Sequence, residues 1–216
     1  MKLVSIQTGL PREVQWQGRI VTTGIFKERV EGPVMLRALN LEGDGQADLT
    51  VHGGADKAVY AYPLEHYEYW QREYPGMELP PGMFGENFTI EGLLESEVNI
   101  GDRFRIGATE VMATAPRLPC YKLGIRFGRP DILKRLLATR RTGFYFSVLR
   151  EGKVQAGDKI ERLQRNETAI AVDDVVQLYA ATKDPAMLQK AINTESLPES
   201  WRGYFQHQLD KLNSRS

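Results

Sequence analysis

The chain contains a single cysteine, Cys120, among its 216 residues. One thiol excludes an internal disulfide, and by itself it cannot hold an iron–sulfur cluster or a thiolate-rich zinc site. Three roles stay open for Cys120: a buried small hydrophobic residue, a nucleophile, or one soft ligand to a group that binds from outside. The shortage of cysteine therefore limits the metal and redox chemistry that the chain can perform alone.

Long apolar runs and a secretory pattern are also missing. No stretch approaches the roughly 20 apolar residues that a membrane-spanning helix needs. The first residues do not combine a basic segment with a long apolar one, as a signal peptide would. With one cysteine and no such signal, we expect a cytoplasmic protein without a membrane partner.

Charge of one sign is not in excess, because 28 basic and 28 acidic residues give a formal net charge of zero. Domains that bind nucleic-acid polymers are usually basic, so this balance argues against such a partner. The sequence has no long-period repeat and no G-x-G-x-x-G dinucleotide fingerprint. The hydrophobic fraction of 42% is sufficient for a buried core, and we expect a globular protein.

Short strand patterns dominate the first 165 residues. They are rich in aliphatic and β-branched side chains, and turn residues such as Gly-Asp precede several of them. The patterns occur at residues 2–7, 19–26, 34–41, 87–90, 98–100, 103–106, 110–114 and 159–163. Many short strands at close spacing predict a mainly β fold, either a barrel or a sandwich.

Two helical patterns interrupt the strands. The first begins at Pro63 and covers residues 64–74, where three aromatic side chains share one face. The second begins at Pro130, and its apolar side chains form a stripe: Ile132, Leu133, Leu136 and Leu137. We therefore expect a β domain with a few inserted helices.

The composition changes after about residue 165, where three helical patterns follow at 169–181, 185–193 and 199–212. Asp184 is expected to cap the second of these helices, with Pro185 as its first residue. The side chains expected to face inward are Val172, Val175, Val176, Tyr179, Trp201, Tyr204, Phe205 and Leu209. A unit of about 45 residues is too small for a core of its own, so it should pack on the β part. The predicted domains are residues 1–165 and 166–216.

The segment around Cys120 is strongly basic. From Arg117 to Arg141 the chain has eight lysines and arginines and one acidic residue, Asp131. Such an excess of positive charge should favour the thiolate form of Cys120 and attract an anion. The segment therefore favours a nucleophile or a metal ligand over a spectator.

A cysteine phosphatase is one alternative, because Cys120 and Arg126 have the C-x5-R spacing of those enzymes. There, loop amides and the arginine hold a phosphate while the thiolate attacks it. Against this, the residues between the two are bulky, and Pro119 stands where those enzymes place a histidine. Those enzymes also set the loop between a strand and a helix of a parallel sheet, whereas we expect only strands near Cys120.

Three further segments hold candidate binding residues. His52-Gly53-Gly54 is followed by Lys57, and the glycines allow backbone amides to approach a ligand closely; an ordinary turn explains the pattern equally well. His52 has no second histidine nearby, so the spacing does not indicate a metal site.

Asn87 ends the segment Phe84-Gly85-Glu86-Asn87 and can both donate and accept hydrogen bonds. This suits the edge of a heterocycle or a clamp between loops, and an Asx turn is an equally good explanation. Lys27 and Arg29 would share one face of a strand, where two cations suit a phosphate or simply face solvent.

Together these motifs resemble the MOSC family, which is named for the C-terminal domain of molybdenum cofactor sulfurases. The resemblance covers nearly the whole β portion, and the appended three-helix unit makes it similar to the YiiM-like bacterial branch. The motifs that carry it, in chain order, are Leu41-Glu42-Gly43-Asp44, Val51-His52-Gly53-Gly54, Phe84-Gly85-Glu86-Asn87, Pro116-Arg117-Leu118-Pro119-Cys120 and Gly143-Phe144-Tyr145-Phe146-Ser147-Val148.

The resemblance implies a MOSC-type β-barrel that binds a mononuclear molybdenum cofactor of the molybdopterin type. It implies that Cys120 is the protein's ligand to molybdenum and the catalytic residue, and a thiolate suits the sulfur-rich surroundings of that metal. The candidates for holding the pterin and its phosphate are Lys27, Arg29, His52, Lys57, Asn87, Arg117 and Lys122.

The resemblance also implies an oxidoreductase, independent of pyridoxal phosphate, that reduces N-hydroxylated compounds. Detoxification of bases such as 6-N-hydroxylaminopurine is the expected role, with the metal performing the redox step. Because the chain has one cysteine and no dinucleotide fingerprint, electrons should come from a separate flavin or iron–sulfur reductase. A carrier of the cofactor or of sulfur, without turnover, is the alternative. We expect a monomer or a homodimer, with the three-helix unit as a docking surface or a structural cap.

Overall fold

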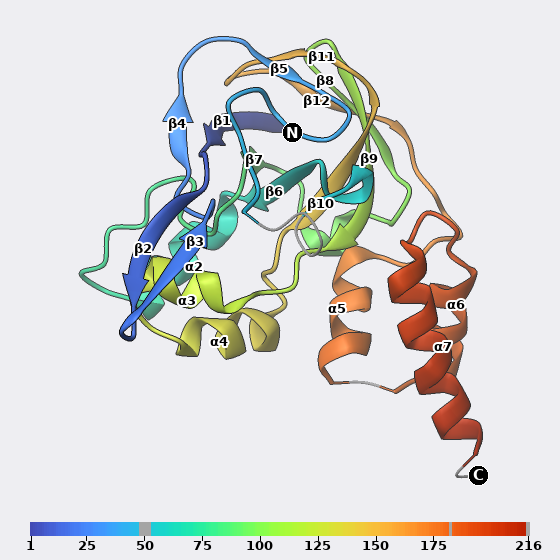
Figure 1. The fold of residues 1–216 in the computed structure, drawn as a ribbon. Coiled ribbons are helices and arrows are strands. Elements are labelled where there is room, and N and C mark those ends of the chain that lie inside the picture. Colours follow the sequence, from blue (N-terminus) through green and yellow to red (C-terminus); the bar gives the residue numbers. More distant parts are fainter. Residues whose placement is uncertain (48–52, 182, 215–216) are drawn as a thin grey trace.

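Eight strands form one sheet in the computed structural model, in the order β12-β8-β9-β10-β6-β7-β1-β4 (Figure 1). The structure describes residues 1–47, 53–181 and 183–214. Neighbouring strands of this sheet are antiparallel except β6 and β7, which are parallel, so the sheet is mixed. Its strands are β1 Lys2–Thr8, β4 Glu28–Val30, β6 Val59–Pro63, β7 Phe88–Glu91, β8 Arg103–Ile106, β9 Thr109–Pro116, β10 Phe144–Arg150 and β12 Ile160–Gln164.

Two smaller sheets accompany the large one. β2 (Arg12–Trp16) pairs with β3 (Arg19–Thr23) as a hairpin, and β5 (Val34–Leu36) pairs with β11 (Gly152–Val154). The predicted strand at 98–100 is wrong, because Asn99 forms only an isolated bridge with Ala171. The predicted strands at 19–26 and 34–41 are real but shorter, since their chains turn away after three to five residues.

The two ends of the large sheet approach each other without forming a continuous ladder. Lys2 in β1 makes an isolated antiparallel bridge with Lys159, just before β12. The amide of Leu3 donates to the carbonyl of Asp158 at 2.9 Å. The sheet-dominated fold is therefore confirmed, whereas no closed barrel forms among the described strands and barrel closure stays a prediction.

Six α-helices occur in the described parts of the chain. They are α2 Glu65–Glu73, α3 Tyr121–Phe127, α4 Asp131–Thr139, α5 Val172–Ala180, α6 Pro185–Asn193 and α7 Glu199–Asn213. Two short 3-10 helices, η1 Ala55–Lys57 and η2 Glu95–Glu97, lie between strands. None of these described helices is long and apolar enough to cross a membrane.

Helix α3 corrects the expectation that only strands surround Cys120. It has seven residues with Gly124 inside, so its intrinsic helical propensity is low. Tertiary packing decides its structure, because Leu123 and Phe127 are buried in an aromatic cluster with Trp70 and Phe84. The helix ends at Gly128, which is left-handed at φ 67° and donates its amide to the last turn.

Helices α5, α6 and α7 lie together at one side of the molecule (Figure 1). The cap of α6 is confirmed, since Asp184 Oδ1 accepts the amides of Ala186 and Met187 at 2.9 and 3.3 Å. Helix α5 contacts β9 and η2, and one hydrophobic core runs from sheet residues such as Phe104 to helix residues such as Phe205. The three-helix unit therefore packs on the β part, as its small size requires.

Two side chains of this unit do not face inward as predicted. Tyr179 and Tyr204 are each 38% exposed, whereas Phe205 is fully buried. The interior of the unit is filled by smaller aliphatic side chains such as Val175 and Leu188 together with Phe205. The two tyrosines are thus left on the surface, beside the segment that carries Cys120.

Candidate functional site

A cavity opens beside Cys120. Its described lining contains four basic side chains and one acidic side chain, so a bound anion would be favoured. The cavity brings together six of the residues predicted from the sequence: Lys27, Lys57, Asn87, Arg117, Cys120 and Lys122. Tyr60, Tyr145 and Asp44 line it as well.

Two predicted site residues are not placed in this lining. The side chain of Arg29 is 58% exposed, and its Nε lies 2.9 Å from a carboxylate oxygen of Glu31. Strand β4 begins at Glu28, after Lys27, so Lys27 and Arg29 do not share a strand face as predicted. His52 lies outside the described residues.

Cys120 is half-buried between β9 and α3, where it is the residue immediately before the helix. This strand–loop–helix placement is closer to a phosphatase loop than the sequence suggested. The sheet here is antiparallel, however, and the guanidinium of Arg126 lies 5.0 Å from the ring of Phe26. Within the described structure, Arg126 lines neither cavity that contains Cys120, so the geometry does not support the phosphatase alternative.

Arg117 is the most deeply buried cation in the described lining of the cavity. It is 6% exposed, and its guanidinium carbon lies 5.0 Å from the centre of the Tyr60 ring. Burial lowers the pKa of Arg117, but the hydroxyls of Tyr60 and Tyr145 and the Cys120 thiol outweigh it, so the net shift is upward. The guanidinium therefore stays charged in a buried position.

One nitrogen of this guanidinium, Nη1, is buried and has no hydrogen-bond partner among the described residues. Leaving a buried donor unpaired costs about 1–3 kcal/mol, and more when the group is charged. An anionic oxygen in the cavity would remove this cost. Arg117 Nη1 is thus a donor that an anion in the cavity could satisfy.

Tyr60 and Tyr145 form the aromatic side of the cavity, with ring centres 5.5 Å apart. Burial raises the pKa of both phenols, while Arg117 acts in the opposite direction. The hydroxyl of Tyr60 donates to the carbonyl of Thr142 at 2.8 Å. Sequence reasoning missed both residues, although Tyr145 lies inside the motif that begins at Gly143.

Lys27 is held by a carboxylate that the sequence analysis did not select. Its Nζ forms an ion pair with Asp44 Oδ1, and both side chains are buried. Burial lowers the pKa of Lys27, while Asp44 raises it. Because Asp44 neutralises Lys27, the net positive charge of the lining comes mainly from Lys57, Arg117 and Lys122. Asp44 is the last residue of the Leu41–Asp44 motif, and this position was the sequence signal that could have identified it as a site residue.

Asn87 connects this ion pair to the rest of the cavity wall. Its Nδ2 donates to Asp44 Oδ2 at 2.9 Å and to the carbonyl of Gln7 at 3.3 Å. Its Oδ1 accepts the amide of Tyr60 at 3.1 Å. Both donors are taken, so Asn87 acts as the clamp between loops that the sequence allowed, and its amide protons are not directed at a ligand.

Glu86, beside Asn87, is fully buried and organises the loop before β7. It accepts the Tyr67 hydroxyl, the amides of Gly82 and Phe84 at 2.7 and 3.1 Å, and the Thr89 hydroxyl at 3.1 Å. Burial raises the pKa of Glu86 despite these donors. The side chain therefore favours the protonated form more than an exposed glutamate does.

This raised pKa predicts a specific pH dependence of stability. The native state holds the Glu86 proton to higher pH than the unfolded chain, so stability should fall as pH rises from about 4.5 through the raised pKa. Glu86→Gln cannot titrate and should lack this component. In urea denaturation across a pH series, the stability of wild type relative to Glu86→Gln should be greatest at low pH and decline upward. A pH-independent difference would contradict the assignment.

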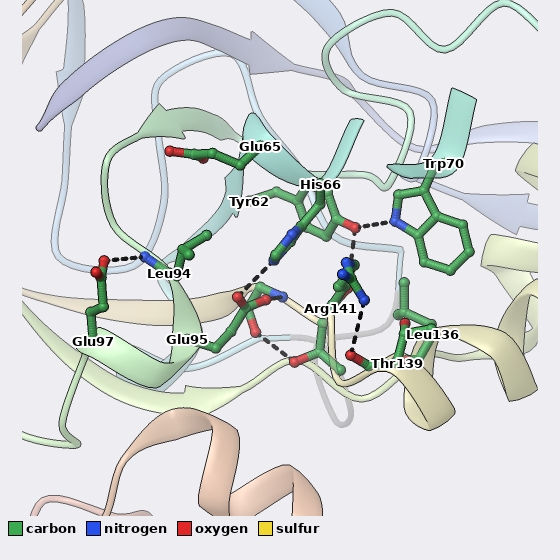
Figure 2. Close-up of polar contacts among 12 residues, drawn as sticks. Tyr62, Glu65, His66, Trp70, Leu94, Glu95, Glu97, Leu136, Thr139 and Arg141 are labelled. Carbon is green, nitrogen blue, oxygen red and sulfur yellow. Dashed lines mark hydrogen bonds and ion pairs between the residues drawn. The ribbon is translucent and has the colours of Figure 1, made fainter. Parts of the chain in front are cut away.

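A layer of polar side chains holds the chain segment that precedes β10 (Figure 2). Tyr62 accepts from Trp70 Nε1 at 2.7 Å and donates to the carbonyl of Arg141 at 3.1 Å. His66 Nε2 lies 2.7 Å from Glu95 Oε2, and Glu95 Oε1 accepts the amide of Gly143 at 2.7 Å. The carbonyls of residues 141–143 are thereby positioned for Tyr62, Tyr60 and the Arg117 amide.

The family model of the MOSC domain matches residues 48–161. The chain belongs to the MOSC-domain family. A second model, the YiiM-like 3-alpha helix domain, matches residues 177–212 within the three-helix unit. The sequence resemblance to the MOSC family is thus confirmed, and the cavity beside Cys120 lies in the matched MOSC region together with adjoining N-terminal loops.

Individual relatives agree with this assignment. The uncharacterized protein YflK of Bacillus subtilis is 41% identical over 97% of this chain and 95% of its own length. The crystal structure of YiiM from Geobacillus stearothermophilus is 34% identical, with a TM-score of 0.81 over 96% of this chain and 98% of that one. A protein of Gibberella moniliformis named "Reductase" is 36% identical over 151 residues. The matched segment is 68% of this chain and 27% of that protein.

Proposed function

We propose that this MOSC protein is a molybdenum-cofactor-dependent reductase of N-hydroxylated compounds. The observation that carries the proposal is the unpaired Nη1 of buried Arg117 in the same cavity as the half-buried thiol of Cys120. An oxygen acceptor for the first and a metal for the second are both present in a phosphorylated metal–pterin cofactor. MOSC domains are associated with binding of the molybdenum cofactor, and one relative is named as a reductase; both support the proposal.

The residues of the cavity fit the chemistry of this group. Arg117, Lys57 and Lys122 would hold the phosphate, since planar guanidinium and ammonium groups are the usual protein donors to phosphate. Cys120 would be the single soft ligand from the protein to molybdenum. When bound, the cofactor would supply the two-electron exchange with the substrate.

The proposed reaction is R–NH–OH + 2 e⁻ + 2 H⁺ → R–NH₂ + H₂O, in which the N–O bond breaks and the oxygen leaves as water. Tyr145 lines the cavity beside Cys120, and because burial raises its pKa it keeps its proton at neutral pH. In this proposal it would donate a hydrogen bond to the departing oxygen. Electrons would come from a separate flavin or iron–sulfur reductase, because one cysteine cannot hold a cluster.

The proposal is tested on protein purified from a host that makes the cofactor. Wild type should contain about one molybdenum per chain and, with an artificial reductant, convert 6-hydroxylaminopurine to adenine and water. Arg117→Met should lose most of the cofactor, roughly 10–100-fold in affinity, because the charge that pairs with the phosphate is gone. Leu149→Ala, at an exposed strand residue, is the matched control and should retain both molybdenum and activity.

The carrier alternative predicts a different result. A carrier of the cofactor or of sulfur would contain molybdenum or a persulfide but would not reduce the N–OH group under any electron supply. Molybdenum-loaded wild type without turnover would therefore reject the reductase proposal, and a wild type that binds neither molybdenum nor a persulfide would reject both.

A further inference from the structure

Two arginines from distant parts of the chain lie against one aromatic ring. The guanidinium carbon of Arg12, in β2, is 4.2 Å from the centre of the Phe26 ring, and that of Arg126, in α3, is 5.0 Å from it. Arg12, Phe26 and Arg126 are absent from the described linings of both cavities that contain Cys120. This arginine pair is therefore a feature separate from the cation-lined cavity beside Cys120.

The arginine pair lies where the β2–β3 hairpin approaches α3 (Figure 1). Arg12 is paired with Thr23 across the hairpin, and Arg126 follows Lys122 by about one turn of α3. Thr23 and Lys122 both line the cavity, as does Lys27, the residue after the shared ring. An occupant of the arginine pair would therefore join segments that also form the cavity wall.

Arg126 carries a donor that the described part of the chain leaves unpaired. Its Nε is buried and has no hydrogen-bond partner among the described residues. Contact with an aromatic ring favours the guanidinium at this place, and the last turn of a helix favours a positive charge. Neither interaction supplies a lone pair to the Nε proton. The unsatisfied donor is unfavourable unless an acceptor comes from outside the chain.

Carboxylates do not balance the two guanidiniums. Burial lowers the pKa of Arg126 and the charge of Arg12 lowers it further, while Glu86 and Glu28 act in the opposite direction. The carboxylate of Glu86 already accepts the Tyr67 hydroxyl and two loop amides, and Glu28 is exposed. Within the described residues, neither arginine forms an ion pair. An anion between two like charges would replace repulsion with attraction.

We infer that Arg12 and Arg126 form an anion site outside the cavity, which takes the phosphoryl group of free phosphate or of a small phosphate monoester. A tetrahedral dianion has enough lone pairs for both guanidinium groups, and arginine matches the geometry of phosphate oxygens. A carboxylate has a single charge and would balance only one of the two arginines. The site is independent of the proposed function, because it shares no residue with the described cavity lining.

The test follows each arginine by the NMR signal of its Nε–H group in the full-length protein, titrated with sodium phosphate at neutral pH and constant ionic strength. In wild type, the signals of Arg12 and Arg126 should shift together and saturate. In Arg126→Met the Arg12 signal should need about tenfold more phosphate, and in Arg12→Met the Arg126 signal should do the same, because one charged donor is lost. Arg19→Met, at an exposed arginine of the same hairpin, is the matched control and should titrate as wild type does.

The signal of Arg117 reports the cavity in the same spectra. Phosphate that shifts Arg117 alone, or that shifts Arg12 and Arg126 no more than chloride does at the same ionic strength, would overturn the site. An equal loss of affinity in Arg19→Met would also overturn it, because general charge screening would then explain the shifts. Phenyl phosphate is the second probe. Tighter binding than inorganic phosphate would identify a phosphate monoester as the ligand, and equal or weaker binding would identify free phosphate.

Discussion

Cys120→Ala is expected to remove molybdenum from the purified protein and to lower N–OH reduction by more than about a hundredfold. Loss of a residue that only supports a metal ligand costs about 10–100-fold in metal affinity or activity, and loss of the ligand itself should exceed that. Cys120 is also one of three described residues, with Tyr145 and Lys57, that line both the cation-lined cavity and the aromatic cleft, to which α5 and α7 contribute a wall. Molybdenum analysis and an N–OH reduction assay on the same preparation check this result.

Cys120→Ser is the matched variant. Serine is a favoured residue immediately before a helix, and Cys120 occupies that position before α3, so the fold should be kept or slightly stabilised. The hydroxyl is a hard, protonated ligand and should not replace the thiolate on molybdenum. An alanine or serine variant that retains both the metal and N–OH reduction would show that Cys120 is not the ligand.

Gly143→Ala is expected to destabilise the protein by roughly 2–5 kcal/mol, which is a large part of the stability of a typical domain. Gly143 has a left-handed backbone at φ 64°. An added Cβ would lie 2.8 Å from the Tyr60 ring and 2.9 Å from the Tyr62 ring, and it would collide with the carbonyl oxygen of Ala61. The carbonyl of Gly143 also accepts the Arg117 amide at 3.2 Å, so cofactor binding should weaken as well.

Gly128→Ala separates the cost of the left-handed backbone from the cost of the steric contacts. Gly128 has a closely similar backbone, with φ 67°, but no atom lies within 4 Å of its added Cβ. The Gly128→Ala variant should therefore lose only about 1 kcal/mol of stability, because the left-handed conformation is the one cost. Urea denaturation of both variants checks the prediction, and equal losses would mean that the contacts with Tyr60 and Tyr62 are not limiting.

The β part and the three-helix unit contribute different surfaces around Cys120. The sheet and its loops supply a cationic cavity in which Arg117 carries the unpaired buried donor. The three-helix unit adds a wall of aromatic rings across the adjoining cleft. A single thiol thus lies between a cation-lined cavity and an aromatic cleft.

Local sequence signals were sufficient where one short segment decides the structure. Asp184 and Pro185 predicted the start of α6, and Pro63 and Pro130 predicted the starts of α2 and α4 to within two residues. The ordered motifs predicted the MOSC family, because each motif keeps its residues within a few positions of one another. The cation-rich segment around Cys120 contributes Arg117 and Lys122 to the cavity lining, and the anion site that it predicts stays a prediction.

Local signals failed where packing between distant segments decides. Helix α3 has weak propensity and forms because Leu123 and Phe127 fill an aromatic cluster. Arg29 looked equivalent to Lys27 in sequence, yet one is exposed and the other is paired with Asp44, 17 residues away. Tyr204 matched the inward-facing period of its helix, but the space inside was already taken by Phe205.

The sequence by itself determined that one thiol lies in a basic segment of a MOSC-family chain. Composition and short motifs carry that information directly, because they depend on residue identity and not on distance. Only the tertiary structure decided which cations line the cavity, that Arg117 has an unpaired buried nitrogen, and that Tyr179 and Tyr204 reach the neighbourhood of Cys120. Those facts depend on contacts between residues tens of positions apart, which folding sets and local pattern does not encode.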